Sequence, residues 1–153
     1  VTTVSGTVVN QHKNFLVRIG TPLSNLLEAV GGAKGEIGKL ISGGPMMGMA
    51  QWTLDTPVTK GTSGVLFFPP EDAKLQNETP CILCSSCIDI CPMKLMPTTI
   101  AHEAKFGKMT EAEKHGALDC IECGSCAFVC PANIKLLQYI RWAKMEIRKM
   151  AKK

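Results

Sequence analysis

All eight cysteines of this chain lie in two short runs that have the same internal spacing. The first run contains Cys81, Cys84, Cys87 and Cys91, and the second contains Cys120, Cys123, Cys126 and Cys130. A proline follows the last cysteine of each run, so the pattern C-x2-C-x2-C-x3-C-P occurs twice. This spacing is typical of thiolates that ligate iron–sulfur clusters, and a cubane cluster needs four such soft ligands. The sequence therefore predicts two [4Fe-4S] clusters as cofactors and no residue in a catalytic role.

The fourth cysteine of each run is expected to ligate the cluster of the other run, as in bacterial two-cluster ferredoxins. One predicted ligand set is Cys81, Cys84, Cys87 and Cys130. The other predicted set is Cys120, Cys123, Cys126 and Cys91. Pro92 and Pro131 disfavour helix in the residue before them, so they help to turn the fourth cysteine away from its own loop. Backbone donors that tune the cluster potentials are expected near Ser85, Ser86, Gly124 and Ser125.

Three other uses of the cysteines stay open at this point, although each is less favoured. Zinc usually binds two well-separated C-x2-C pairs, which would leave the third and fourth cysteine of each run without a role. Disulfides suit an even number of cysteines, but cysteines this close pair poorly and the chain shows no signal peptide. A thioredoxin-like redox pair would not be repeated with a matched C-P. His12, His102 and His115 are interpreted as structural or surface residues.

The composition divides the 153 residues into two parts, because eleven of the fourteen glycines precede residue 65 and every cysteine follows residue 80. Hydrophobic residues make up 45% and charged residues 20%, which is ordinary for a globular chain. No apolar run approaches the ~20 residues of a membrane span. The formal net charge of +4 is concentrated in residues 141–153, which carry six Lys or Arg and one Glu. Thiolate ligands require a reducing compartment, so we expect a cytoplasmic placement.

Residues 1–72 show the pattern of a small sheet domain with one helix. Strands are predicted at Val1–Val9, Phe15–Ile19, Lys39–Ser42, near Val58 and at Gly64–Phe68. Thr21 before Pro22 is typical of a helix N-cap, and Gly31 and Gly32 are expected to end a helix of about nine residues. This order suits a β-grasp fold. No glycine motif of a nucleotide site is present.

The cysteine-containing part is predicted to be helical outside its loops. A helix is predicted at 97–106, Thr110 and Glu113 form a candidate capping box, and Ile134 to Met150 carry apolar residues on one helical face. The predicted fold class is therefore α+β. It comprises a β-grasp domain at 1–72, a linker at 73–80, and an α-helical ferredoxin-like domain with two clusters and a basic C-terminal helix at 81–153.

Several segments together resemble the RnfC subunit of the Rnf electron-transport complex. They are Ile41–Gly48, Thr59–Gly64, the two cysteine runs and Asn133–Arg141. The resemblance covers essentially the whole chain and implies an SLBB domain, which is a ligand-binding β-grasp domain, followed by a domain with two [4Fe-4S] clusters. It also implies that the chain is the C-terminal portion of a longer subunit whose upstream domain binds FMN and NADH.

For function, the resemblance implies an electron-transfer module of an ion-translocating NADH:ferredoxin oxidoreductase. The implied partners are the other membrane and soluble subunits of an Rnf-like complex and a redox protein such as ferredoxin, with no nucleic acid. The implied location is the cytoplasmic side of the membrane, as a peripheral subunit. Three alternatives stay open: a fragment of a cobalamin-reductase-like flavoprotein, a ligand-binding β-grasp module whose clusters are structural, and a cluster-based sensor.

Overall fold

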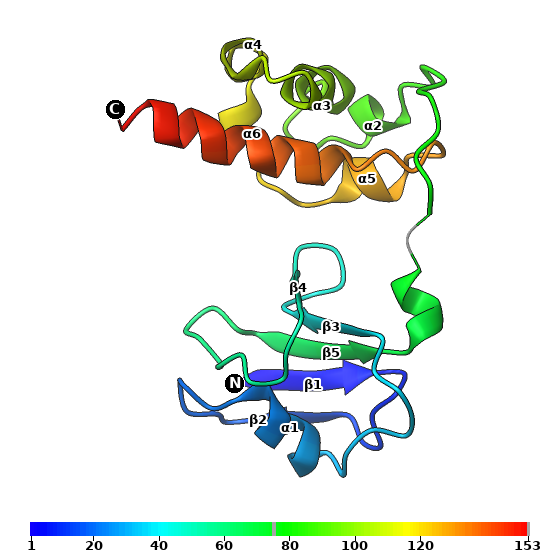
Figure 1. The fold of residues 1–153 in the computed structure, drawn as a ribbon, viewed down its shortest axis with the longest axis vertical. Coiled ribbons are helices and arrows are strands. Elements are labelled where there is room, and N and C mark those ends of the chain that lie inside the picture. The colour runs from blue at the N-terminus through cyan, green and yellow to red at the C-terminus, as the bar shows by residue number, and fades with distance from the viewer. Residues whose placement is uncertain (75, 153) are drawn as a thin grey trace. The chain divides into compact units, whose positions relative to one another are not determined.

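A computed structural model describes residues 1–74 and 76–152 of the chain. The chain forms two compact units, at residues 1–75 and 76–153, which we call the sheet unit and the helical unit. Figure 1 shows that strands are confined to the first and that long helices are confined to the second. Among the described residues, no helix is both long enough and apolar enough to cross a membrane.

The sheet unit contains a five-stranded mixed sheet with the strand order β2-β1-β5-β3-β4 (Figure 1). Its strands are β1 (Thr2–Gly6), β2 (Lys13–Phe15), β3 (Lys39–Ser42), β4 (Met49–Gln51) and β5 (Gly64–Phe68). The central pair β1 and β5 is parallel, with Val4 opposite Val65, and every other pairing is antiparallel. A mixed α/β unit of this kind agrees with the predicted class.

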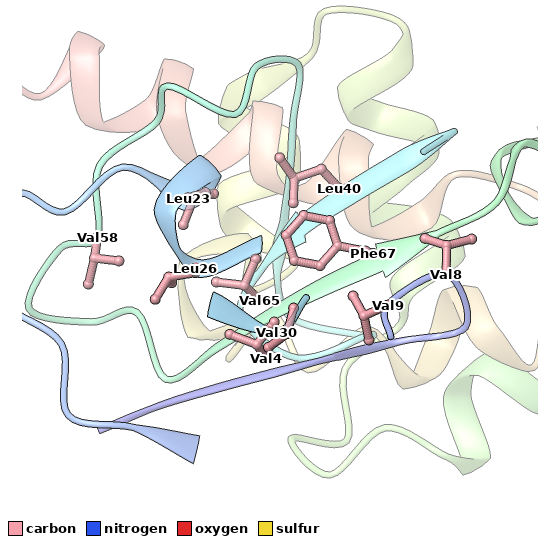
Figure 2. Close-up of a cluster of buried hydrophobic side chains, with 10 residues drawn as sticks. All are labelled: Val4, Val8, Val9, Leu23, Leu26, Val30, Leu40, Val58, Val65 and Phe67. Carbon is pink, nitrogen blue, oxygen red and sulfur yellow. The ribbon is translucent and has the colours of Figure 1, made fainter. Parts of the chain in front are cut away.

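One apolar core holds the sheet unit together (Figure 2). The short helix α1 (Leu23–Ala29) contributes Leu23 and Leu26, which point toward the side chains of the sheet. Along β5, Val65 and Phe67 are fully buried while their neighbours are only partly so, because alternate residues of a strand point to opposite faces. The other buried members are Val4, Val8, Val9, Val30, Leu40 and Val58.

Some sequence predictions for the sheet unit are confirmed and others are wrong. Gly31 and Gly32 end α1 as predicted, since both have a positive φ and their N–H groups bond to the last turn. Thr21 is not the N-cap, because its hydroxyl donates to the carbonyl of Arg18 and Pro22 occupies the cap position.

Two strands also differ from the prediction. The second strand is Lys13–Phe15 rather than Phe15–Ile19, so it begins two residues earlier than predicted. The edge strand at Met49–Gln51 was not predicted. Val58 pairs through its backbone with Gly20 and Thr21, outside any named strand.

The helical unit consists of five α-helices and one short 3-10 helix over its described residues (Figure 1). The helices are α2 (Ser86–Asp89), α3 (Pro97–Lys105), α4 (Met109–Lys114), α5 (Ser125–Phe128) and α6 (Leu136–Met150), and the 3-10 helix η2 spans Ala117–Asp119. A further 3-10 helix, η1 (Pro70–Ala73), belongs to the sheet unit. The apolar face of α6 buries Ile140, Ala143 and Ile147 in a core shared with α3 and α4, which confirms the amphipathic pattern.

The predicted capping box is wrong. The helix α4 already begins at Met109, with Lys108 at its N-cap and no side-chain cap, so Thr110 lies inside the helix. The buried side chains of Met109 and Ala112 explain the earlier start, because both pack into the helical core. The packing of this apolar pair outweighs the preference of threonine for a cap.

The helical unit is built from two similar halves. The helices α5 and α6 begin at Ser125 and Leu136, each 39 residues after the corresponding starts of α2 and α3 at Ser86 and Pro97. Each half is thus a cysteine loop, a short helix, a turn after the fourth cysteine and a longer helix. This internal repeat makes a residue-by-residue comparison of the two cysteine loops possible.

Candidate metal centres

Two cavities in the helical unit are lined by cysteines from both runs. The first has a free volume of about 210 Å³, and the cysteines that line it are Cys81, Cys84, Cys87 and Cys130. The second has a free volume of about 20 Å³, and the cysteines that line it are Cys91, Cys120, Cys123 and Cys126. Each cavity therefore gathers the four cysteines of one predicted ligand set. All eight are free of disulfides.

The backbone of the two cysteine loops is unusual in the same places. Leu83 and Ser85 in the first loop have φ values of 56° and 62°, and Glu122 and Gly124 have values of 60° and 84° in the second. Except for glycine, L-residues rarely adopt this left-handed conformation. Its repetition at equivalent positions shows that both loops are wound in the same way, which brings three thiols of a run to one side.

The turn after each fourth cysteine is repeated as well. Lys94 and Asn133, with φ values of 52° and 53°, each donate a backbone hydrogen bond to the carbonyl of the fourth cysteine, at 3.0 and 3.1 Å. Pro92 and Pro131 are the second residues of these turns, immediately after the fourth cysteine. The chain is thereby redirected so that each fourth cysteine lines the cavity of the other run.

Two serines at equivalent positions favour the thiolate form of the second cysteine in each run. The Ser86 hydroxyl donates to Cys84 Sγ at 3.4 Å and lowers the pKa of that thiol. The Ser125 hydroxyl lowers the pKa of Cys123 in the same way, and a backbone N–H group of each serine adds to the effect. Backbone donors near Ser86 and Ser125 were predicted, whereas donation by their hydroxyl groups was not. A thiolate is the form of cysteine that binds metals.

Burial has the opposite effect on three other cysteines. It raises the pKa of Cys87 and Cys120, and it raises the pKa of Cys126 to about 11. Such thiols stay protonated at neutral pH unless a cation takes the place of the proton, and a coordinated metal deprotonates a thiol outright. Eight free thiols, in two groups of four that each line one cavity, are a donor set that fits two iron–sulfur clusters.

Other backbone donors at the sulfurs were not anticipated from the sequence. The N–H group of Leu95 lies 3.4 Å from Cys91 Sγ, and the N–H group of Glu122 lies 3.4 Å from Cys120 Sγ. The glycine or serine content of a loop, which guided the prediction, does not reveal these donors because any residue can supply a backbone N–H group.

The two cavities differ in their exposure to solvent. Cys81 and Cys84 are exposed, and the intervening Ile82 and Leu83 have 68% and 84% of their surface exposed. In the second set, Cys91, Cys120 and Cys123 are partly buried and Cys126 is buried. The first set therefore lies nearer the surface of the helical unit.

The histidines line neither cysteine cavity, in agreement with their structural interpretation. Ser5 Oγ lies 3.2 Å from a ring nitrogen of His12, His102 stacks at a tilt on Phe106, and His115 forms the C-cap of α4. Among the residues that the structure describes, no group of three or more His, Cys, Asp or Glu side chains is arranged to hold a single metal ion.

Comparisons with known families agree with this division of the chain. Residues 1–50 match the SLBB domain, and residues 80–134 match the 4Fe-4S dicluster domain. The second match supports the prediction of two [4Fe-4S] clusters in the helical unit.

Nearly the whole chain is also similar to part of a longer protein. It is 49% identical over 97% of its length to the C subunit of a proton-translocating ferredoxin:NAD(+) oxidoreductase complex from Clostridium ljungdahlii. It is 45% identical over 95% of its length to the C subunit of a Na(+)-translocating ferredoxin:NAD(+) oxidoreductase complex from Acetobacterium woodii. The C subunit of an ion-translocating oxidoreductase complex from Methanosarcina acetivorans is likewise 45% identical. The chain spans about a third of the length of these curated relatives.

Proposed function

We propose that the chain is the electron-transferring portion of the C subunit of an ion-translocating ferredoxin:NAD(+) oxidoreductase complex. The observation that carries this proposal is the arrangement of eight free thiols as two groups of four around separate cavities in a 4Fe-4S dicluster domain. The similarity of nearly the whole chain to the C subunits of such complexes supports the choice of complex.

The proposed ligands of one cluster are Cys81, Cys84, Cys87 and Cys130. Those of the other are Cys91, Cys120, Cys123 and Cys126. When bound, such a cluster accepts and releases single electrons at a potential that depends on charge, hydrogen bonds to sulfur and exposure. The Ser86 and Ser125 hydroxyls and the backbone N–H groups of Leu95 and Glu122 would stabilise negative charge on the sulfurs to which they donate.

The contrast in exposure suggests separate roles for the two ligand sets. The loop Cys81–Cys84 presents thiols and apolar side chains to solvent, so it is suited to electron exchange with a protein partner. The second set lies deeper, where α6 and its buried side chains exclude water. The remaining residues of the helical unit act by holding and insulating the two centres, so no acid, base or nucleophile is required.

We further propose a β-grasp fold of the SLBB type for residues 1–72. The mixed sheet, its central parallel pair and the single helix packed on it support this assignment. Residues 73–80 would act as a linker and 81–153 as the cluster domain. Part of that linker is held by the helical unit, since the N–H group of Thr79 bonds to the carbonyl of Ala132 at 3.0 Å.

At the level of the whole subunit, we propose that an upstream domain with FMN passes electrons from NADH to these clusters. Their onward transfer would be coupled to ferredoxin and to movement of Na⁺ or H⁺. The proposed partners are the other subunits of the complex and a ferredoxin, and the proposed location is the cytoplasmic face of the membrane, as a peripheral subunit. The names of the relatives support this interpretation, because they describe proton- and Na(+)-translocating ferredoxin:NAD(+) oxidoreductases.

The decisive test is anaerobic reconstitution of the chain with iron and sulfide, followed by quantification of both elements. A redox titration monitored by electron paramagnetic resonance then follows the bound centres. We expect about eight irons per chain and two reversibly reducible, magnetically interacting centres. Binding of zinc in preference to iron, or clusters that cannot be reduced reversibly, would contradict an electron-transfer function.

Four single alanine variants test the ligand assignment. Cys91→Ala and Cys120→Ala should disturb the same paramagnetic centre, whereas Cys130→Ala and Cys81→Ala should disturb the other. The reason is that the two cysteines of each pair belong to the same proposed ligand set, so either substitution removes one ligand of the same cluster. If Cys91→Ala instead matches Cys81→Ala, each run binds its own cluster and the exchange of fourth cysteines is wrong.

A further inference from the structure

A buried lysine contacts the backbone of the second cysteine loop. Lys144, in the middle of α6, is only 6% exposed, and Thr2 is the only other polar residue in the described part of the chain that is buried to this degree. Its ammonium group donates a hydrogen bond of 2.6 Å to the carbonyl oxygen of Cys120, which is a proposed cluster ligand. A buried lysine is rare unless it is paired, because burial of a charge is costly.

The ion-pair partner of Lys144 is a residue of the second cysteine loop. Glu122 Oε1 lies 2.8 Å from Lys144 Nζ, and Glu122 Oε2 lies 3.0 Å from Arg141 Nε. Glu122 is thus a carboxylate held between two cations by direct ion pairs. The three side chains together carry two positive charges and one negative charge. Lys144 is the buried member of this group, so a buried positive charge lies beside the second ligand set.

The first half of the repeat lacks this arrangement. The residue equivalent to Lys144, 39 positions earlier, is Lys105, whose side chain is 54% exposed and lies 3.6 Å from Glu78. The residue equivalent to Glu122 is Leu83, which cannot form an ion pair. The two loops share their cysteines and their backbone conformation but not the charge beside them.

A fixed positive charge stabilises the reduced form of a nearby redox centre, because reduction adds negative charge. The effect is larger for a buried charge than for an exposed one, since a low dielectric strengthens the interaction and salt screens it less. Net charge near a cluster is one of the factors that set its potential. Lys144 also orients Cys120 through the carbonyl group, so it can act on both charge and geometry.

We propose that Lys144 is a positioning residue whose positive charge, supported by Arg141 and opposed by Glu122, raises the reduction potential of the centre held by Cys91, Cys120, Cys123 and Cys126. This inference rests on the proposed binding of two clusters. It adds a means by which one chain makes two centres with identical cysteine spacing different. The distinction is carried by α6 and by one residue of the second loop, and not by the cysteines.

Three charge variants of the iron-loaded chain test the proposal by the sign of the change. Lys144→Gln removes a positive charge, so the midpoint potential of one centre should shift to a more negative value. Glu122→Gln removes the negative charge and should shift the midpoint of the same centre to a more positive value. Arg141→Gln should give a smaller negative shift than Lys144→Gln, because its side chain is 31% exposed and the solvent screens its charge.

Two further variants separate charge from structure. Lys144→Arg keeps the positive charge and should restore most of the potential lost in Lys144→Gln. Lys105→Gln, at the equivalent position of the first half, should leave the midpoint of the affected centre unchanged. The measurement is a redox titration monitored by electron paramagnetic resonance, with iron content determined for every variant.

The outcomes distinguish failure of this inference from failure of the proposed function. Full iron content with unchanged midpoints in Glu122→Gln and Arg141→Gln overturns the role of the charges, even if Lys144→Gln fails to fold. Shifts of the same sign in Glu122→Gln and Arg141→Gln also overturn it, because a purely structural disturbance has no reason to follow the sign of the charge. A wild-type chain without reducible clusters would overturn the proposed function first, and this inference with it.

Discussion

The two units of this chain use different means to stabilise a fold. The core of the sheet unit consists of ten buried Val, Leu and Phe side chains drawn from the strands, the helix and the loops. The main core of the helical unit has eight buried residues, of which four are alanines, at positions 104, 112, 117 and 143. Alanine buries little apolar surface, so it contributes less hydrophobic free energy than Val, Leu or Phe.

Backbone strain shows the same contrast. Within the described part of the chain, the five non-glycine residues with positive φ all lie in the helical unit: Leu83, Ser85, Lys94, Glu122 and Asn133. All five lie within or just after a cysteine run, where tight winding directs the thiols. The comparison indicates that the sheet unit is stabilised by its own core, whereas the helical unit depends on metal ligation to offset strain and a small core.

Removal of iron should therefore produce the largest difference in stability between the two units. When a chelator strips the chain anaerobically, we expect the helical unit to lose its helical structure and the sheet unit to stay folded. Far-ultraviolet circular dichroism should show loss of most of the helical signal, and amide resonances of the sheet unit should keep their dispersion. Restoration of iron and sulfide should recover the helical signal. An iron-free helical unit with native amide dispersion would contradict the comparison.

The reverse experiment removes the largest core side chain of the sheet unit. Phe67 is fully buried, so Phe67→Ala should lower the free energy of unfolding of the sheet unit by about 3–5 kcal/mol. Iron content and cluster spectra should stay at wild-type values, because Phe67 belongs to the separate core. Denaturant titration of the iron-loaded chain, followed by amide resonances of each unit, measures both effects. Leu16→Ala, at a side chain that is 91% exposed, is the matched control and should change little.

Substitution of glycine at a strained turn should change the free energy of unfolding by a smaller amount, and it should stabilise the fold rather than destabilise it. Lys94 has a φ of 52°, so Lys94→Gly should raise the free energy of unfolding of the helical unit by about 0.5–1 kcal/mol. Asn133→Gly, at the equivalent turn, should give a smaller gain because asparagine tolerates this conformation better than lysine does. Loss of cluster absorbance in guanidinium provides the measurement. Equal destabilisation by both changes would show that these turns are not strained.

The smallest expected effect concerns the carboxylate of Glu78. Its Oε1 accepts a hydrogen bond of 2.9 Å from the N–H group of Lys135, and the lysine at 105 lies 3.6 Å from Oε2. The hydrogen bond from Lys135 lowers the pKa of Glu78 below its usual value of 4.5. Burial opposes this shift, and the charge of Lys105 and the hydroxyl of Tyr139 add smaller contributions that lower the pKa. A lowered pKa means that this contact stabilises the folded helical unit above pH 4.5 and that the gain disappears as the pH falls through the folded-state pKa.

Glu78→Gln should accordingly lower the unfolding temperature of the helical unit slightly at pH 7, by an amount equivalent to less than about 1 kcal/mol. The difference from wild type should shrink as the pH is lowered toward 4 and should be absent from the sheet unit. Thermal unfolding at several pH values measures this trend. A difference that grows on acidification would show that the carboxylate is not stabilised in its ionised form.

Much of the cofactor chemistry was predictable because it is local. A thiolate every three residues, followed by a cysteine before proline, is a short pattern, and the match of residues 80–134 to the 4Fe-4S dicluster domain agrees with it. The strands Lys39–Ser42 and Gly64–Phe68 were predictable too, because their apolar and β-branched residues are buried in the sheet. The edge strand Met49–Gln51 escaped because its residues are exposed or only partly buried, so no apolar periodicity marks it.

The errors at helix ends have a common physical cause. Thr21 and Thr110 both have the residue type of a cap, but their roles were decided by contacts that the cap pattern does not include. The helix α4 starts early because Met109 packs into the helical core, and the Thr21 hydroxyl bonds to Arg18. A capping preference contributes only about 1 kcal/mol, so packing can override it.

The sequence by itself determined the class of cofactor, the presence of two similar cysteine loops and the order of most elements, since each of these depends on residues close together in the chain. The spacing also suggested which four thiols belong together, but only the tertiary structure places each four around one cavity and Lys144 against the carbonyl of Cys120. Those contacts join residues up to 49 positions apart, as for Cys81 and Cys130. They form because two copies of one local motif pack together, and no local pattern specifies the charges that such packing brings beside each site.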